Sequence, residues 1–113
     1  MMRDNQFLFD ILDSAKLAVS YIVDKTKADF LSDIQCQDAI NYRLMIIGEA
    51  ANRVSETTRQ TLSNLPWRKM IGMRNVVVHE YDDVNLNIIW DTLHYDLPSV
   101  IVELEEVVHS EGE

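Results

Sequence analysis

The chain has 113 residues, of which 47% are hydrophobic and 26% charged, with only three Gly and two Pro. That length allows one domain, and the composition excludes a disordered chain and is typical of a helical globular domain. The single cysteine, Cys36, excludes an internal disulfide framework and favours a reducing cytoplasm, while the formal net charge of −9 is opposite to that of most nucleic-acid-binding domains. We therefore predict one helical domain over residues 1–113, with an acidic C-terminal tail at about residues 109–113.

The first two predicted helices each carry one apolar stripe. Residues 4–24 have hydrophobic side chains at three- and four-residue steps, which indicates an amphipathic helix: Phe7, Ile11, Ala15, Ala18 and Ile22. Residues 25–29 lack this pattern and are interpreted as a loop. Either Ser32 or Asp33 then caps a second helix, whose stripe has the same spacing: Cys36, Ile40, Leu44, Ile47, Ala51 and Val54. Gly48 costs this helix about 1 kcal/mol relative to Ala, but it allows another helix to pack closely.

The third predicted helix begins at Pro66, after a polar connection over residues 55–65. One face of this helix is formed by residues at helical spacing: Trp67, Met70, Ile71, Arg74, Val77 and Val78. Met73 and Val76 are predicted to point elsewhere, so that the helix is apolar on nearly all sides. Such a helix either lies at the centre of a bundle or contacts a second subunit. Residues 76–78 are β-branched, but no strand of comparable length is available to pair with them.

A fourth helix is predicted after Asp83, with a stripe that continues in phase almost to the end of the chain: Leu86, Trp90, Leu93, Leu97, Ile101, Leu104 and Val108. Pro98 falls inside this stripe, so either the helix kinks there or a fifth helix starts with Pro98 near its first position. The predicted fold is an all-α, antiparallel, up-and-down bundle of four or five helices. No apolar run approaches the about 18 residues needed to cross a bilayer, so no membrane association is expected.

The segment Arg74-Asn75-Val76-Val77-Val78-His79-Glu80-Tyr81 brings together a permanent cation, an amide, an imidazole and a phenol. Arg74 lies on an apolar stripe, and a buried Arg needs an anionic partner. It therefore either forms a salt bridge, for example with Glu49, or binds a phosphate. His79 either stabilises a helix C-terminus or acts in acid–base chemistry. Tyr81 is either an amphipathic residue at a helix exit or part of the same site.

The spacing of these residues favours a site at the end of the third helix. Five residues along an ideal helix correspond to about 140° of rotation, so a straight helix would keep Arg74 and His79 apart. They converge if the helix ends near Val78, or if two subunits of a dimer contribute to one cleft. His79 and Tyr81 point the same way if the chain there is extended.

This arrangement, Arg-Asn, three residues, His, one residue and Tyr, resembles the signature of the HEPN-domain ribonucleases, specifically the HepT-like toxins. The similarity extends over nearly the whole chain and includes Gly48-Glu49-Ala50, the lead-in at residues 67–73, Trp90 and Leu97-Pro98. The resemblance implies a HEPN-like bundle that forms a homodimer, with the motif residues of both subunits facing one cleft. It also implies metal-independent cleavage of RNA. The implied partner is a minimal nucleotidyltransferase antitoxin that transfers AMP to the motif tyrosine, which is Tyr81 here.

The chemistry of the residues is consistent with the implied RNA cleavage. His79 can remove the proton of a 2′-hydroxyl near neutral pH, and Arg74 offers a fork of donors for the phosphate oxygens. Asn75 can orient the phosphate or His79, and the sequence suggests neither a metal site nor a cofactor. Two other interpretations stay open. One is a non-enzymatic helical module that docks a nucleotidyltransferase, which the acidic charge favours. The other is an ion-paired dimer core without chemistry.

Overall fold

The computed structural model describes the backbone of residues 2–78 and 85–112, and the side chains of residues 3–75 and 86–108. Within these ranges the chain has no strand and consists of helices: α1 (Met2–Ser20), α2 (Lys27–Leu31), α3 (Ile34–Arg53), α4 (Glu56–Thr61), α5 (Trp67–Val78), α6 (Asn85–Asp91), the π-helical segment η2 (Thr92–Asp96) and α7 (Leu97–Gly112). None of the helices described is both long enough and apolar enough to cross a membrane. The predicted all-α class is confirmed.

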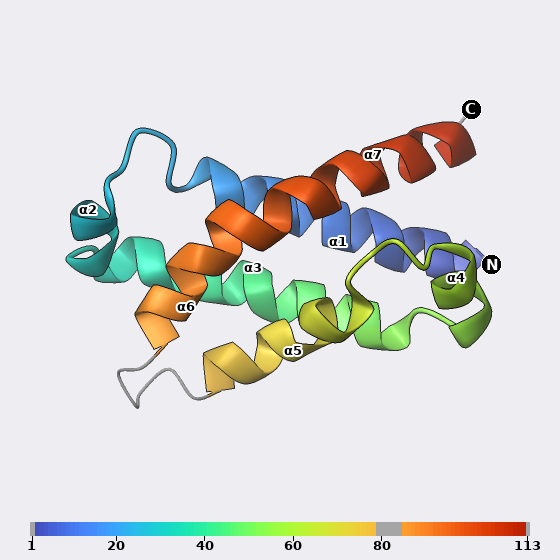
Figure 1. Ribbon diagram of the computed structural model, residues 1–113, viewed down its shortest axis with the longest axis horizontal. Coiled ribbons are helices and arrows are strands. Elements are labelled where there is room, and N and C mark those ends of the chain that lie inside the picture. Colours follow the sequence, from blue (N-terminus) through green and yellow to red (C-terminus); the bar gives the residue numbers. More distant parts are fainter. Residues whose placement is uncertain (1, 79–84, 113) are drawn as a thin grey trace.

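The long helices α1, α3, α5 and α7 run alternately in opposite directions (Figure 1). α3 packs against α1 on one side and α5 on the other, while α7 packs on α1. α6, η2 and α7 follow one another as a nearly continuous arm that runs back toward the end of the bundle where the N-terminus lies. The short helices α2 and α4 lie at opposite ends of the bundle. The antiparallel up-and-down arrangement predicted from the sequence is therefore confirmed.

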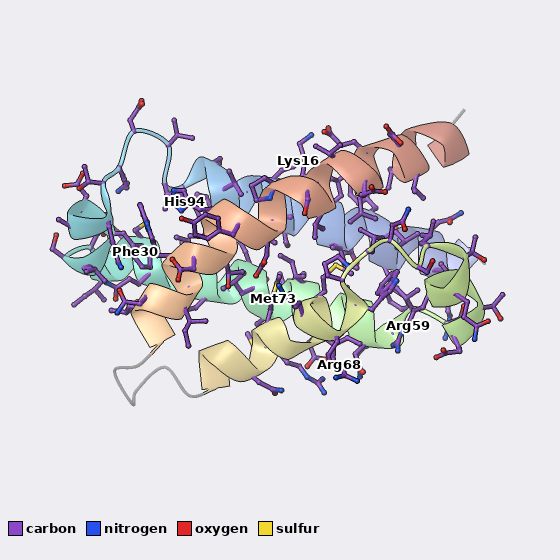
Figure 2. All side chains as sticks on the ribbon, viewed as in Figure 1. Lys16, Phe30, Arg59, Arg68, Met73 and His94 are labelled. Atoms are coloured by element: carbon purple, nitrogen blue, oxygen red, sulfur yellow. The ribbon has the colours of Figure 1, made fainter. Side chains whose placement is uncertain are left out.

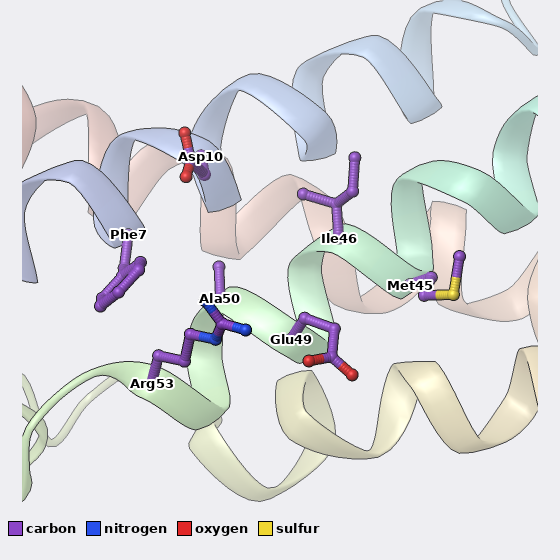
Figure 3. Close-up of a pocket in the computed structure, with 7 residues that line it drawn as sticks. All are labelled: Phe7, Asp10, Met45, Ile46, Glu49, Ala50 and Arg53. Carbon is purple, nitrogen blue, oxygen red and sulfur yellow. The ribbon is translucent and has the colours of Figure 1, made fainter.

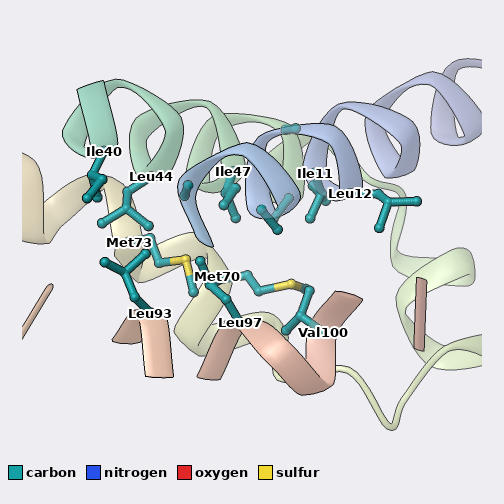
Figure 4. Packing of buried hydrophobic residues seen from close by; sticks show 14 of the residues in the cluster. Ile11, Leu12, Ile40, Leu44, Ile47, Met70, Met73, Leu93, Leu97 and Val100 are labelled. Atoms are coloured by element: carbon teal, nitrogen blue, oxygen red, sulfur yellow. The ribbon is translucent and has the colours of Figure 1, made fainter. Parts of the chain in front are cut away.

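The core lies where the apolar stripes of these helices meet (Figure 4). Its fully buried large side chains come from α1, α2, α3, α5, α6, η2 and α7, and include Ile11, Phe30, Ile40, Leu44, Ile47, Met70, Ile89, Leu93, Leu97 and Val100. The prediction that Met73 points away from the stripe is wrong. Met73 is 3% exposed and lies in the core with Met70, because residues three apart on a helix share a face.

The outer side of α5 is less apolar than predicted. Arg68 and Lys69 are exposed, and a Cβ placed on Gly72 would have no neighbouring atom within 4 Å. The described part of α5 therefore buries one face against α3 and the core, and leaves the opposite face open.

Two segments predicted as connections contain short helices. The loop predicted at residues 25–29 includes the start of α2, where Thr26 and Asp29 form a reciprocal capping box. The connection predicted at residues 55–65 contains α4, whose first turn is capped by the Ser55 hydroxyl, which accepts a hydrogen bond from the Thr58 amide at 3.3 Å. In both cases a local cap stabilises a helix that is too short to show an apolar period in the sequence.

The ends of the long helices follow their capping residues. α1 ends at Ser20, earlier than predicted, and the turn that follows closes at Asp24 with a left-handed φ of 64°. Of the two predicted caps for α3, Asp33 is the one used, and its carboxylate accepts from the Cys36 amide at 3.0 Å. Pro66 immediately precedes α5, and its carbonyl accepts the first helical hydrogen bond from Met70.

Pro98 is the second residue of α7, which begins at Leu97 directly after the π-helical segment. A proline cannot donate the hydrogen bond that a continuous α-helix would require at this position. The wider π turn over Thr92–Asp96 takes up this irregularity. A new helix therefore starts near Pro98, as one of the two predicted alternatives stated, without a loop before it.

Candidate functional site

Arg74 lies where α5 contacts α3. Its Nη1 donates a hydrogen bond to Oε1 of Glu49 at 3.1 Å, and the two side chains are 35% and 50% exposed, respectively. The salt bridge considered from the sequence is therefore present. Arg74 lies at the edge of the core, so its guanidinium remains open to solvent and to a ligand.

Gly48 makes this contact possible. A Cβ at Gly48 would lie 2.8 Å from the backbone nitrogen of Arg74 and 3.1 Å from the carbonyl oxygen of Ile71. Backbone atoms cannot yield to such a contact, so a larger residue would push α5 away from α3. The predicted close approach at Gly48 is confirmed, and the backbone that it approaches is that of Arg74.

The other predicted site residues are only partly covered by the structure. Asn75 follows Arg74 on α5 and is exposed. His79 and Tyr81 lie outside the described residues. Their convergence with Arg74, by a turn of the chain or across a dimer, stays a prediction.

A groove of about 370 Å³ lies between α1 and α3, beside Glu49 (Figure 3). It is lined by apolar side chains and by three charged ones: Phe7, Asp10, Met45, Ile46, Glu49, Ala50 and Arg53. Glu49 therefore borders both the groove and Arg74. The Glu49 carboxylate itself points toward α5, where it accepts from Arg74.

The charge of the chain is distributed unevenly. Residues 43–74 contain only two acidic residues, Glu49 and Glu56, against six basic ones: Arg43, Arg53, Arg59, Arg68, Lys69 and Arg74. This segment has a net charge of +4, which leaves −13 for the rest of the chain. It forms the C-terminal half of α3, all of α4 and most of α5 (Figure 2). The overall composition hides this basic segment, and a charge count along the sequence would have found it.

A second polar cluster, not predicted from the sequence, joins α1 to α4. Asp4 is 6% exposed, and its carboxylate accepts hydrogen bonds from the Ser55 amide at 3.1 Å, the Ser55 hydroxyl at 2.6 Å and the Thr58 hydroxyl at 2.6 Å. These bonds, above all the one from the Ser55 hydroxyl, lower the pKa of Asp4. The carboxylate is satisfied inside the protein, so we assign the cluster a structural role.

His94 and Cys36 each have a partner within the described part of the fold. His94 is exposed, with its Nδ1 2.9 Å from the carbonyl oxygen of Trp90 and its ring 4.3 Å from the Trp90 ring. Cys36 is buried and donates to the carbonyl oxygen of Tyr21 at 3.6 Å, and burial raises the pKa of its thiol. These contacts give His94 and Cys36 structural surroundings, and Cys36 lies on the buried side of α3, as its place in the apolar stripe predicted. The described part of the chain contains no group of three or more His, Cys, Asp or Glu side chains arranged to hold a metal ion.

Residues 11–107 match the model of a family described as "Ribonuclease HepT-like". The chain belongs to the HepT-like ribonuclease family. The matched range includes the whole segment from Arg74 to Tyr81 as well as Gly48 and Glu49. The family resemblance inferred from the motif is therefore confirmed.

Three similar proteins match this HepT-like chain over about nine tenths of their own length. The chain is 35% identical over 108 residues to "Putative RNase MJ0127" of Methanocaldococcus jannaschii, which covers 95% of this chain and 89% of the relative. It is 32% identical over 101 residues to "Putative RNase MJ1380" of the same organism, covering 89% and 93%. It is 31% identical over 101 residues to "Probable ribonuclease HepT" of Thermococcus cleftensis, covering 89% and 92%. No solved structure gives a significant match.

Proposed function

We propose that this chain is a metal-independent endoribonuclease that acts in the cytoplasm as the toxin of a toxin–antitoxin pair. The observation that carries this proposal is the HepT-like family match, which includes the complete segment Arg74–Tyr81. The position of Arg74 supports it, because a half-exposed guanidinium beside a groove can reach a phosphate from solvent. The basic segment over residues 43–74, which ends at Arg74, supports it as well, since this part of the chain has a net positive charge despite the acidic whole.

In the proposed reaction, the nucleophile is the 2′-hydroxyl of the RNA. His79 removes its proton, the 2′-oxygen bonds to the adjacent phosphorus, and the bond from phosphorus to the 5′-oxygen breaks. The His79 of the second subunit protonates the leaving 5′-oxygen. The products are a 2′,3′-cyclic phosphate and a 5′-hydroxyl. Arg74 stabilises the negative charge that develops on the phosphate oxygens, and Asn75 orients the phosphate or His79.

The proposed cleft belongs to a homodimer. Arg74 and His79 are five positions apart in the chain, and a dimer provides two copies of each for one substrate. Light scattering of the purified protein at micromolar concentration should give twice the chain mass of 13.1 kDa. A mass of one chain would contradict the composite cleft.

Tyr81 is proposed as the site of regulation by a minimal nucleotidyltransferase. The phenol oxygen attacks the α-phosphorus of ATP, AMP is attached to Tyr81, and pyrophosphate leaves. The added AMP brings bulk and negative charge beside His79, which repels the RNA phosphate.

Tyr81→Phe should keep most of the nuclease activity, because a phenol with a pKa near about 10 is a poor base at neutral pH. The variant should resist neutralisation by the nucleotidyltransferase with ATP. Mass spectrometry should find added AMP on the wild type and none on Tyr81→Phe. AMP found on another residue would remove Tyr81 from this role.

The central test is incubation of the purified protein with tRNA and total RNA in the presence of EDTA. We expect cleavage with 2′,3′-cyclic phosphate ends for the wild type and none for His79→Ala. Activity that disappears in EDTA and returns with Mg²⁺ would contradict the metal-independent mechanism. Absence of cleavage under all conditions, with intact binding to the nucleotidyltransferase, would instead support the non-enzymatic binding module.

A further inference from the structure

The Glu49–Arg74 ion pair contributes little to the stability of the fold. The two side chains are 50% and 35% exposed, and ion pairs this open to water contribute little to folding. The Lys16–Glu105 pair between α1 and α7 is comparable, with a distance of 3.3 Å and exposures of 54% and 51%. Glu49 differs from Glu105 in its partner, because it binds the guanidinium of the motif residue Arg74.

The backbone fixes Glu49 relative to Arg74. Gly48 immediately precedes Glu49, and its Cα is so close to α5 that an added Cβ would lie 2.9 Å from the Cβ of Arg74. The Cα atoms of Glu49 and Arg74 are therefore positioned by a direct contact between two helices. The carboxylate consequently meets the guanidinium at a defined position. Two long side chains on helices farther apart would sample many relative positions.

The pair leaves most of the guanidinium available. An Arg side chain has five N–H donors, and Glu49 Oε1 accepts from Nη1. Among the described residues, Glu49 is the partner found for this guanidinium. A phosphate can therefore bind the remaining donors while the carboxylate still holds Nη1. A guanidinium that is already oriented loses less rotamer freedom when the phosphate arrives.

We propose that Glu49 is a positioning residue that orients the Arg74 guanidinium for the scissile phosphate. This inference rests on the proposed function, in which Arg74 stabilises the charge of the reacting phosphate. Orientation matters most in the transition state, where misplacement of a charged group by about 1 Å costs up to roughly 100-fold in rate. The loss of Glu49 should therefore lower kcat more than it raises KM.

A competing role predicts the opposite result. If Glu49 merely occupied Arg74 and competed with RNA, its removal would free the guanidinium and tighten RNA binding. Glu49→Ala also removes one negative charge from the protein, which would tighten RNA binding further. The sign of the change in kcat and in affinity therefore separates positioning from competition.

The experiment compares Glu49→Ala, Glu49→Gln and the matched control Glu105→Ala, which also removes one carboxylate from an exposed interhelical ion pair. Steady-state cleavage of an RNA oligonucleotide gives kcat and KM, and fluorescence anisotropy with the 2′-O-methyl form, which cannot react, gives the affinity. We expect kcat to fall about 10- to 100-fold in Glu49→Ala. Glu49→Gln keeps an oxygen acceptor at the same reach and should recover much of this loss, while Glu105→Ala should behave as wild type.

A readout independent of cleavage completes the test. In ¹⁵N NMR spectra of the Arg side chains, rotation within the Arg74 guanidinium should be slow in the wild type and in Glu105→Ala, and fast in Glu49→Ala. Unchanged kcat in Glu49→Ala, or tighter 2′-O-methyl RNA binding with full kcat, would overturn the proposal. If the wild type neither binds nor cleaves RNA, the proposed function is wrong, and the NMR signal then decides whether Glu49 orients Arg74.

Discussion

Asp4 and Arg74 are two charged side chains that join helices, and they do so in different ways. Asp4 connects α1 to α4, is 6% exposed and accepts three hydrogen bonds from Ser55 and Thr58. Arg74 connects α5 to α3, is 35% exposed and donates to Glu49. The bonding capacity of Asp4 is directed into the protein, whereas much of that of Arg74 is directed outward.

The difference follows from the cost of removing a charge from water. A buried carboxylate must be compensated by hydrogen bonds within the fold, and the loss of its donors or of the carboxylate itself leaves polar groups unsatisfied. A half-exposed guanidinium keeps part of its hydration and contributes little to stability. The stability of the fold should therefore depend on Asp4, and the activity should depend on Arg74.

The largest expected effect is that of Arg74→Ala on RNA cleavage. Loss of the guanidinium removes donors aimed at the developing charge, and the rate should fall by about 100- to 1,000-fold. The free energy of unfolding should fall by only about 1 kcal/mol, from the lost packing of the aliphatic stem. Single-turnover cleavage and urea unfolding measure the two quantities.

Arg68→Ala is the control for this prediction, because Arg68 is an exposed cation on the same helix. It should weaken RNA binding mildly and leave the maximal rate nearly unchanged. The comparison would fail if Arg74→Ala cleaved RNA within a factor of two of the wild type.

Asp4→Ala should show the reverse pattern. Three donors lose a buried acceptor, and the free energy of unfolding should fall by about 3 kcal/mol. Cleavage per folded molecule should stay at the wild-type level, because Asp4 lies on α1 at its contact with α4. Denaturant unfolding and activity measured on the same samples test both statements. A stable but inactive Asp4→Ala variant would contradict the structural assignment.

The pH dependence of stability provides a second check on Asp4. Its pKa is lower in the folded protein than the ordinary value of 3.8, so the folded state favours the ionised form. The stabilisation is complete above the unfolded-state pKa and is lost as the pH falls through the folded-state pKa. The difference in unfolding free energy between the wild type and Asp4→Asn should therefore shrink below about pH 3.8. A difference that grows under acid conditions would have the wrong sign.

The sequence predicts the fold well because the fold depends on repeated local patterns. Apolar residues at helical spacing identify α1, α3, α5 and α7, and Asp33 was among the expected caps. The short helices α2 and α4 were missed because a few residues do not establish a period. Their formation depends on single hydrogen bonds such as those of Thr26 and Ser55.

The sequence predicts only part of the candidate site. The motif pointed to Arg74 and to Glu49 as its possible partner, because a cation on an apolar stripe needs an anion. Asp4 was missed because its partners lie 51 and 54 residues away, and no spacing rule links them. The degree of exposure of Arg74 could not be predicted either, since it depends on how close α3 and α5 approach each other at Gly48.

Gly48→Ala tests whether the close packing of α3 against α5 positions Arg74. The added Cβ would meet the backbone nitrogen of Arg74 at 2.8 Å, so α3 and α5 must separate. Overpacking of this kind costs about 2 kcal/mol in unfolding free energy. The same displacement moves Arg74 away from Glu49, so cleavage should also fall. Full activity together with wild-type stability would show that the helices accommodate the methyl group without moving.

Gly72→Ala is the matched substitution with the smallest expected effect and the opposite sign. Gly72 also lies on α5, but a Cβ there would meet nothing within 4 Å. Alanine restricts the unfolded chain and favours the helix, so the free energy of unfolding should rise by about 0.5–1 kcal/mol. Thermal unfolding at several protein concentrations measures this gain. A loss of stability that grows with protein concentration would mean that a second copy covers this face of α5, which would place Gly72 in the interface of the proposed homodimer.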